Sequence, residues 1–401
     1  MLSGSETQSR YEKKIEFAYY LAFICQGLTG SIFGPSMVWF ANRTNSSVAE
    51  ITPVLVFYNI GFIISSLVIS RAFDRRPGNR LMGAAVAVLS AALAGLCLVR
   101  SRWTYFLLAF VIGTVLSVID NGPNILFPWL LGERAKRPLN MVHLFYSVGC
   151  IITPFLIGVS LKRWNEAFPV FALLAFVIIF PALFLFRLPS PAIRSDGPSG
   201  SSGSAAGSAS LQLIGAAGLF GLFMFLFSSS QSTVNHWIST VLVKNGLADE
   251  SFAAMLASVF WVGTFTGRLL AAYLVEKLSP AKIVFICLAV AAADGTVMLF
   301  ARGMLPLIAV CMFMNGFATG PVLANAFSIM KSRGFISAKM NGIVTACGQC
   351  GGLLLPSLFG KFYGDSSSSY IPFVLIILCA SLLELLVLHF ILKDRTGPAG
   401  A

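Results

Sequence analysis

Asp120 is the residue of this chain best suited to carry chemistry, because it lies inside a long apolar run. Burial away from water disfavours an ionised carboxylate, so such a group can take up a proton or bind a sodium ion. Asn124 lies one helical turn later on the same face, and Asn121 lies beside it. These residues predict an ion-coupling carboxylate next to amides that bind a polar solute. The alternative is a structural hydrogen bond between helices.

Further polar side chains in apolar runs are candidates to bind a solute, since they cost free energy in hydrocarbon without a partner or a wet cavity. Gln231 and Asn235 share one helix face. His236 and Trp237 lie next to that face, and amides together with an aromatic plane suit the hydroxyls and apolar ring face of a sugar. The alternative for Asn235 to Trp237 is the outer membrane interface, where Trp is enriched. The remaining candidates for solute binding, for which helix packing is the alternative, are Gln26, Asn59, Trp261, Asn315 and Gln349.

Two ionisable residues at helix positions allow other roles. Arg268 lies inside an apolar run and needs an anion, a carboxylate or the headgroup region. It predicts either the anion site of a monocarboxylate carrier or a snorkelling side chain that pairs with acidic loop residues. His143 predicts a second ion-coupling group that relays protons, or else a cap at the cytoplasmic end of a helix. Asp294, Glu384 and His389 are interpreted as structural.

Two charged loops show that the chain contains an internal repeat, a signal that constrains the fold before other signals do. The residue pairs separated by 202 positions are Gly61 and Gly263, Asp74 and Glu276, Arg75 and Lys277, and Arg80 and Lys282. We expect these charged residues, together with Arg268, to act in conformational gating. Asp74 can cap or pair with cations at neighbouring helix ends, and Arg75 and Arg80 can bind the other half or anionic lipid. The alternative is that they only orient the protein in its membrane.

Composition predicts a polytopic membrane protein. Hydrophobic residues make up 57% of the chain and charged residues 11%, against roughly 25% charged residues in soluble domains. The net charge of +12 is scattered in small groups between apolar runs, which favours membrane orientation over nucleic-acid binding. The eight cysteines lie mostly inside apolar runs and are typical of packing residues rather than disulfides. No nucleotide-binding loop or metal-ligand cluster appears in the sequence, so neither an enzyme nor a metal or other cofactor is expected.

The apolar runs predict an all-α membrane protein with twelve transmembrane helices. Two six-helix halves, 15–188 and 211–392, are expected on either side of a cytoplasmic Gly/Ser/Pro linker at 189–210, with tails at 1–14 and 393–401. The expected helices are 15–41, 52–72, 81–99, 104–131, 139–161, 168–187, 211–234, 252–275, 281–300, 304–328, 337–361 and 370–392, the seventh with a possible extension to Val243.

The distribution of basic residues predicts that both termini are cytoplasmic. With the N-terminus inside, 19 Lys and Arg residues lie on the cytoplasmic side and 8 lie outside. This bias follows the positive-inside rule. The same orientation places the glycosylation sequons at Asn42 and Asn45 outside, where glycans are added. The protein is expected in the plasma membrane or an internal membrane.

The arrangement of six helices, a linker and six helices, with its repeated charged loop, resembles the major facilitator superfamily. The loop pattern of that family is Gly-x-x-x-Asp-Arg-x-Gly-Arg-Arg. Asp74, Arg75 and Arg80 fit it, whereas Ser70 replaces the first glycine and Pro77-Gly78 shifts the turn by one residue.

Short stretches resemble one branch of this family, the fucose permease and its animal relatives, the sodium-dependent glucose transporter-like proteins. These stretches are Gly34-Pro35, Val118-Ile119-Asp120, Leu139 to Gly158, Phe260-Trp261, Gly267-Arg268-Leu269-Leu270 and Ser279-Pro280-x-Lys282.

The resemblance implies transport of a small polar solute, most simply a sugar, by alternating access around a central cavity. It implies a helix-4 carboxylate tied to proton coupling, and Asp120 is the matching residue, whereas Gln26 stands where that permease has an acid on helix 1. A proton or a sodium ion is therefore expected as the coupling ion. The expected partners are a small-molecule substrate and the lipid bilayer, without nucleic acid, and a monomer is expected. A membrane sensor or scaffold that transports nothing is the alternative from a different class.

Overall fold

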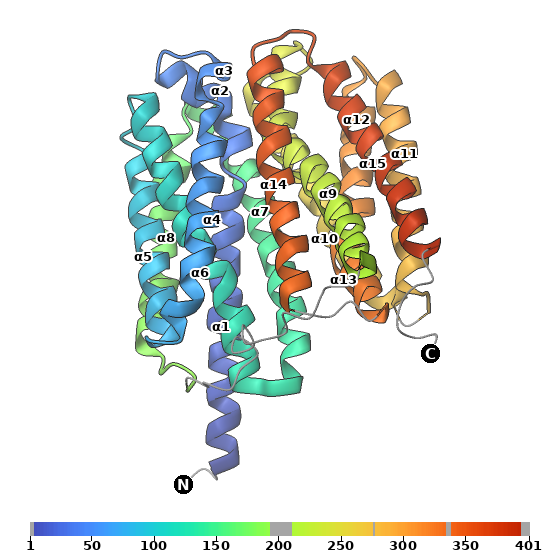
Figure 1. Cartoon of the computed structure of the whole chain (residues 1–401). Coiled ribbons are helices and arrows are strands. Elements are labelled where there is room, and N and C mark those ends of the chain that lie inside the picture. The colour runs from blue at the N-terminus through green and yellow to red at the C-terminus, as the bar shows by residue number, and fades with distance from the viewer. Residues whose placement is uncertain (1–3, 193–210, 276, 334–337, 394–401) are drawn as a thin grey trace. The chain divides into compact units, whose positions relative to one another are not determined.

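Every regular element in the part of the chain that the structure describes is a helix, and the expected all-α fold is confirmed. The computed structural model describes residues 4–192, 211–275, 277–333 and 338–393. The chain forms two compact units, Met1–Gly200 and Ser201–Ala401 (Figure 1). Their boundary falls inside the expected linker, most of which lies outside the described residues.

Unit 1 contains eight α-helices and one short 3-10 helix within its described residues. They are α1 (Gly4–Gly30), α2 (Phe33–Arg43), α3 (Val48–Ile51), α4 (Pro53–Phe73), α5 (Gly78–Leu96), α6 (Arg102–Leu131), η1 (Gly132–Ala135), α7 (Lys136–Trp164) and α8 (Phe168–Arg187).

Unit 2 contains seven α-helices within its described residues. They are α9 (Leu211–Lys244), α10 (Glu250–Leu274), α11 (Pro280–Phe300), α12 (Leu305–Thr319), α13 (Val322–Ser332), α14 (Ala338–Tyr363) and α15 (Tyr370–Lys393).

The lengths and surfaces of these helices suit a bilayer. In the described residues, ten helical segments are long and apolar enough to cross a membrane, and the bent pair of α1 and α2 raises the number to eleven. The helix α9, 34 residues long, would supply the twelfth expected crossing. Leu67, Phe176 and Phe300 are 72%, 65% and 79% exposed. Lipid tails accommodate such apolar surfaces, which water does not.

The first expected helix differs from the structure at both ends. It begins at Gly4 instead of residue 15, because polar contacts support the added turns: Tyr11 donates a hydrogen bond to the carbonyl of Pro189 over 2.9 Å, and Arg134 pairs with Glu12 at 3.2 Å. The expected span 15–41 is also not one helix. It breaks between Gly30 and Phe33, and α2 continues at an angle of 45°.

The expected helix 304–328 is likewise divided, into α12 and α13, at Gly320 and Pro321. Proline has no backbone N–H to continue the helical hydrogen bonds, so a break at this dipeptide is expected physically. Together α12 and α13 are long enough for one crossing, Leu305–Ser332.

Backbone-to-backbone contacts at glycines hold α4 against α6 in unit 1. A Cβ atom placed on Gly61 would lie 2.2 Å from the carbonyl oxygen of Phe110, and one placed on Gly113 would lie 1.9 Å from that of Tyr58. No side chain larger than hydrogen fits at either distance. Association of helices in lipid depends on such close approach, because lipid tails are as apolar as the side chains they would replace.

The same contacts recur between α10 and α12 in unit 2. A Cβ atom on Gly263 would lie 2.1 Å from the carbonyl oxygen of Phe313, and one on Gly316 would lie 1.9 Å from that of Phe260. These four residues correspond to the four of unit 1 at separations of 202 and 203 residues. The internal repeat therefore extends from the sequence to the packing of equivalent helices.

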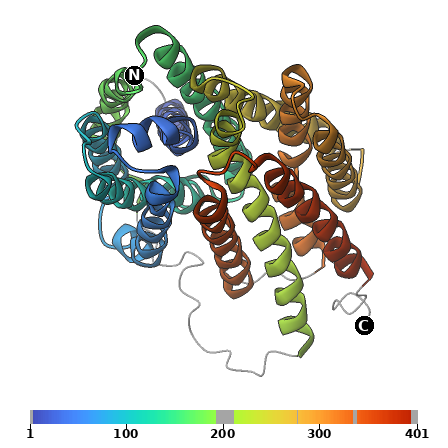
Figure 2. The same ribbon diagram turned by 90° about the horizontal axis from the view of Figure 1, so that it is seen from above.

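A second kind of close pair joins α9 and α14, which lie side by side in both views (Figures 1 and 2). A Cβ atom on Gly351 would lie 2.1 Å from the carbonyl oxygen of Phe225. Its counterpart in unit 1 is Gly149 on α7, where a Cβ atom would lie 2.3 Å from the carbonyl oxygen of Ile24 on α1.

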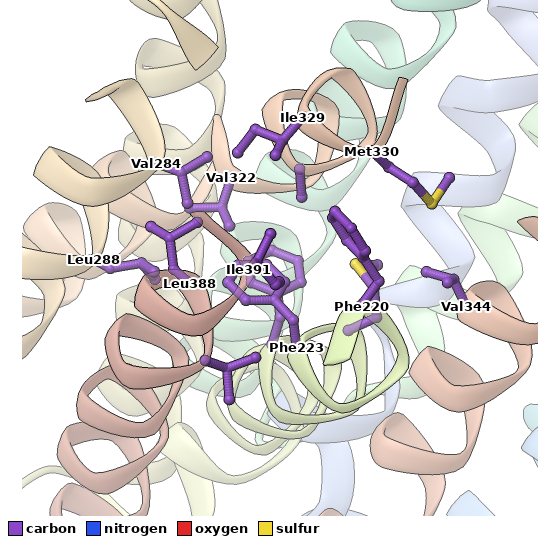
Figure 3. Packing of buried hydrophobic residues seen from close by; sticks show 14 residues of the cluster. Phe220, Phe223, Val284, Leu288, Val322, Ile329, Met330, Val344, Leu388 and Ile391 are labelled. Carbon is purple, nitrogen blue, oxygen red and sulfur yellow. The ribbon is translucent and has the colours of Figure 1, made fainter. Parts of the chain in front are cut away.

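Unit 2 also has a buried apolar cluster, shown in Figure 3. Phe220 and Phe223 of α9 gather there with Leu388 and Ile391 of α15. Val284 of α11, residues of α13 and Val344 of α14 also belong to it. This cluster fixes how α9, α11, α13 and α15 pack.

The glycine contacts predict that a side chain added at a packed glycine lowers the stability of the protein. The substitution Gly113→Val should destabilise the protein by about 1–3 kcal/mol or more, because the Tyr58 carbonyl cannot move without moving α4. Thermal unfolding of the purified protein in detergent measures this loss. The matched control is Gly215→Ala, since nothing lies within 4 Å of a Cβ atom at Gly215. Equal stability of the Gly113→Val variant and the wild type would contradict the packing.

Candidate functional site

Asp120 and Gln26 form a polar pair inside unit 1. The amide Nε2 of Gln26 on α1 donates a hydrogen bond to Oδ1 of Asp120 on α6 over 2.9 Å. Gln26 is 7% exposed, and its Oε1 has no hydrogen-bond partner in the described part of the chain. The phenol of Tyr58 on α4 also lies within electrostatic range of Asp120. A carboxylate and a free amide oxygen therefore lie together in an apolar span, which is a setting for a proton or a small cation.

The asparagines beside Asp120 use their donors within their own helix. Asn124 donates from Nδ2 to the carbonyl of Asp120 over 2.8 Å, and Asn121 donates to the carbonyl of Ser117 over 2.8 Å. Asn59 on α4 does the same toward Leu55, over 2.7 Å. Asn124 is exposed and Asn121 is half-buried, so these two can offer a solute their Oδ1 acceptors.

His143 lies elsewhere on unit 1. It is exposed on α7, and its ring meets Phe23 of α1 edge-on, with centroids 5.8 Å apart. Phe23 is three residues before Gln26, so the α1–α7 contact places His143 beside the helix that carries Gln26. A role of His143 in ion coupling stays a prediction.

Asn235 and Trp261 form the polar pair of unit 2. The indole Nε1 of Trp261 on α10 donates to Oδ1 of Asn235 on α9 over 3.0 Å. Trp261 is 9% exposed, and Asn235 is half-buried. This hydrogen bond fixes the amide so that its Nδ2 group points away from the indole. Such an oriented donor beside an aromatic ring is suited to a hydroxylated solute.

The residues next to Asn235 separate into buried and accessible ones. Trp237 is fully buried and donates to the carbonyl of Pro356 on α14 over 2.9 Å, so it packs helices and does not mark the membrane interface. His236 is 7% exposed, and its Nδ1 has no partner in the described residues. Gln231 on α9 and Gln349 on α14 are half-buried.

The equivalent of the Gln26 and Asp120 pair in unit 2 is apolar. Ile24 corresponds to Phe225, 201 residues later, so Gln26 corresponds to Phe227. Gly113 corresponds to Gly316, 203 residues later, so Asp120 corresponds to Leu323. Phe227 belongs to the apolar cluster of Figure 3, and Leu323 packs against that cluster. The repeat therefore preserves the scaffold but confines the carboxylate pair to unit 1.

Asn315 is a fully buried candidate. It is 1% exposed on α12 and lies within interaction range of Asp294 of α11. A role of Asn315 in solute binding stays a prediction.

Arg268 on α10 contacts the backbone at the break between α12 and α13, which divides the expected helix 304–328. Its Nε donates to the carbonyl of Gly320, between α12 and α13, over 3.4 Å. The equivalent positions in unit 1 are Ser66 and Ser117, whose hydroxyls lie 3.4 Å apart. Both units therefore have a polar contact at equivalent positions of the two helices. In unit 2 this contact holds the Arg268 side chain against the backbone at Gly320.

The remaining gating candidates lie at the ends of helices. Asp74, Arg75 and Arg80 are exposed at the α4–α5 loop. Lys277 hydrogen-bonds the hydroxyl of Tyr273 and lies over its ring, with Nζ 4.3 Å from the centroid. Glu276 lies outside the described residues.

One polar cluster of unit 1 has no signal in the sequence beyond its residue types. Arg43, inside the first sequon, donates to the carbonyls of Val99 and Cys97 over 3.1 Å each and pairs with Glu166 at 3.4 Å. Trp39 donates to the same Glu166 over 3.1 Å. This cluster ties α2 to the α5–α6 and α7–α8 connections.

Comparison with known proteins shows what the chain resembles. The Major Facilitator Superfamily profile matches residues 19–247. The sodium-dependent glucose transporter 1 of Danio rerio is 20% identical over 90% of this chain, which spans 66% of that relative's length. The solved structure of a mutant of the nucleoside transporter NupG has a TM-score of 0.74 and 14% identity, covering 95% of this chain and 100% of its own. A D-xylose-proton symporter has a TM-score of 0.70 and 12% identity, covering 93% and 97%.

The pairing of Gln26 with Asp120 predicts energetic coupling. In a double-mutant cycle of Gln26→Ala and Asp120→Ala, the two effects on unfolding free energy should deviate from additivity by about 0.5–3 kcal/mol, because each substitution removes the one hydrogen bond that the residues share. Thermal or chemical unfolding in detergent measures the cycle. A control cycle of Gln26→Ala with Glu50→Gln should be additive within about 0.5 kcal/mol, since Glu50 is exposed on α3 and pairs with Arg102 instead. Additivity in both cycles would contradict the pair.

Proposed function

The chain belongs to the Major Facilitator Superfamily and is a multi-span solute transporter, and we propose that its solute is a sugar and that Asp120 couples its movement to a cation. The observation that carries the coupling proposal is the 2.9 Å hydrogen bond between Gln26 and Asp120 in apolar spans. The names of a glucose transporter and a xylose symporter among similar proteins support the sugar.

The Asp120 pair can bind a cation through oxygen atoms alone. Gln26 donates from its nitrogen, which leaves its buried Oε1 unpartnered in the described residues. A proton on the second carboxylate oxygen, or a sodium ion near both residues, would give this oxygen an electrostatic partner. Occupancy of the site would then favour one conformation of the transporter over another, as gradient-driven alternating access requires.

The Asn235 and Trp261 pair supports a sugar as the solute. A sugar presents hydroxyl groups that both donate and accept hydrogen bonds, together with an apolar ring face. The Asn235 amide supplies donors, the half-buried Gln231 and Gln349 supply further amides, and Trp261 supplies the aromatic neighbour. A monocarboxylate would instead need a cation, and Arg268 already donates to the Gly320 carbonyl.

Uptake into proteoliposomes tests the substrate and the ion together. Sugars and monocarboxylates are offered with an inward proton gradient, with an inward sodium gradient, or with neither. We expect accumulation of a sugar with one of the two gradients. Accumulation of monocarboxylates alone would overturn the sugar assignment, and equal accumulation without any gradient would overturn the coupling.

The substitution Asp120→Asn should abolish gradient-driven accumulation while exchange of solute across the membrane survives. Asparagine keeps the shape and an oxygen acceptor for Gln26 but removes the charge that binds the cation. Counterflow and uptake are measured in the same proteoliposomes. Glu50→Gln is the control: Glu50 is exposed and caps α3, and glutamine can retain that cap. Full accumulation by the Asp120→Asn variant would contradict the assignment.

The substitution Trp261→Phe should weaken apparent solute affinity about tenfold, with little effect on the maximal rate. Phenylalanine keeps the aromatic ring but removes the N–H that orients Asn235, a loss of about 1–1.5 kcal/mol. The concentration dependence of exchange measures the change. Trp103→Phe serves as a control, since Trp103 is 65% exposed at the start of α6. Unchanged affinity for every transported sugar would remove Asn235 and Trp261 from the site.

A further inference from the structure

A second buried carboxyl lies in unit 2. Asp294 is 7% exposed on α11, inside the apolar span Pro280–Phe300. The helix α11 packs against α12, α13 and α15. Cys311 and Asn315 of α12 lie within interaction range of Asp294.

Two oxygen atoms of this group have no hydrogen-bond partner in the described residues. They are Oδ2 of Asp294 and Oδ1 of Asn315, and Asn315 is 1% exposed. Both oxygens are acceptors when the carboxyl is ionised, so they cannot satisfy one another. Leaving each unsatisfied in the interior costs about 1–3 kcal/mol. If Oδ2 of Asp294 carries a hydrogen, this oxygen becomes a donor, and a hydrogen bond from it to Oδ1 of Asn315 would satisfy both atoms.

The neighbouring ionisable groups do not supply that hydrogen. On α15, Tyr370 is within electrostatic range of Asp294, but its hydroxyl donates to the carbonyl of Met298 over 2.8 Å. Arg302, beyond the end of α11, lies within electrostatic range of Tyr370. On α12, the Cys311 thiol is a weak donor. On α13, Lys331 is exposed at the end of the helix.

A metal ion suits this group less well than a proton. Hard cations bind about six or more oxygen ligands. In the part of the chain that the structure describes, no group of three or more His, Cys, Asp or Glu side chains could hold a metal ion. A single hydrogen on Oδ2 of Asp294 satisfies this oxygen without any further ligand.

We propose that Asp294 and Asn315 form a second proton-binding site of the protein, within unit 2 and separate from Asp120. In this site the Asp294 carboxylate takes up one proton from water and forms an O–H bond, and the O–H group donates to Oδ1 of Asn315. Release of the proton restores the carboxylate, and no other bond changes. The protein at neutral pH therefore holds Asp294 as a neutral carboxylic acid.

Infrared spectroscopy of the full-length protein in detergent tests this site without any substrate. The difference spectrum between wild type and Asp294→Asn at neutral pH should contain the C=O band of one protonated carboxylic acid. In Asn315→Leu the band should shift to higher frequency, because the O–H loses its acceptor. Glu384→Gln is the control, since Glu384 is another buried carboxyl of unit 2, and the Asp294 band should persist in it. Absence of an acid band from the wild-type minus Asp294→Asn spectrum would overturn the proposal.

Thermal unfolding across pH provides the second measurement. The Asp294→Asn variant should fold, because its Nδ2–H reproduces the donor to Asn315, and its Tm should be nearest that of the wild type in acid. Between the ordinary pKa of an unfolded aspartate, about 3.9, and the pKa of folded Asp294, the wild type should lose stability with rising pH relative to this variant, since its unfolded state releases a proton that the folded state keeps. Failure of Asp294→Asn to fold, or parallel pH profiles, would contradict a neutral Asp294. Asp120→Asn should retain the Asp294 band, so the transport proposal and this one can fail separately.

Discussion

Close approach of helix backbones at glycines is the constraint on which both units depend. In lipid, apolar side chains gain little by leaving a solvent as apolar as themselves, so packing and internal hydrogen bonds must hold helices together. The contacts of Gly61 and Gly113 fix α4 against α6, and those of Gly263 and Gly316 fix α10 against α12. These contacts fix the position of one helix along the other. They thereby fix where polar side chains on the neighbouring turns meet the facing helix. Asp120 lies two turns beyond Gly113 on the same helix.

The two units share this scaffold but differ in the chemistry they place on it. Unit 1 contains the hydrogen bond between Gln26 and Asp120, and the corresponding positions of unit 2, Phe227 and Leu323, are apolar. Unit 2 instead contains the hydrogen bond between Asn235 and Trp261. The proposed division of labour rests on this difference, because a carboxylate is able to bind a cation and an amide beside an aromatic ring is able to bind hydroxyl groups. The packing contacts tolerate such divergence, since they depend on glycines and backbone carbonyls.

The break between α12 and α13 requires a polar contact of its own. The span of α12 and α13 is interrupted at Gly320 and Pro321, and Arg268 donates to the carbonyl that the interruption leaves. A broken helix in hydrocarbon must satisfy such carbonyls from nearby side chains. The equivalent contact in unit 1 uses two serine hydroxyls, Ser66 and Ser117, although α6 continues through that level. The arginine at this position therefore has a backbone partner within its own unit.

The sequence by itself determined the class of the fold and the repeat, and it singled out Asp120 as a candidate, because hydrophobic runs, glycine spacing and a carboxylate in an apolar run are local properties. Helical periodicity also placed Asn121 and Asn124 near Asp120. Only the tertiary structure decided which partners these residues have. It paired Asp120 with Gln26 and turned the amides of Asn59, Asn121 and Asn124 onto their own helices. Periodicity gives the face of a helix, whereas rotamers and the neighbouring helix decide where a side chain finds its hydrogen bond.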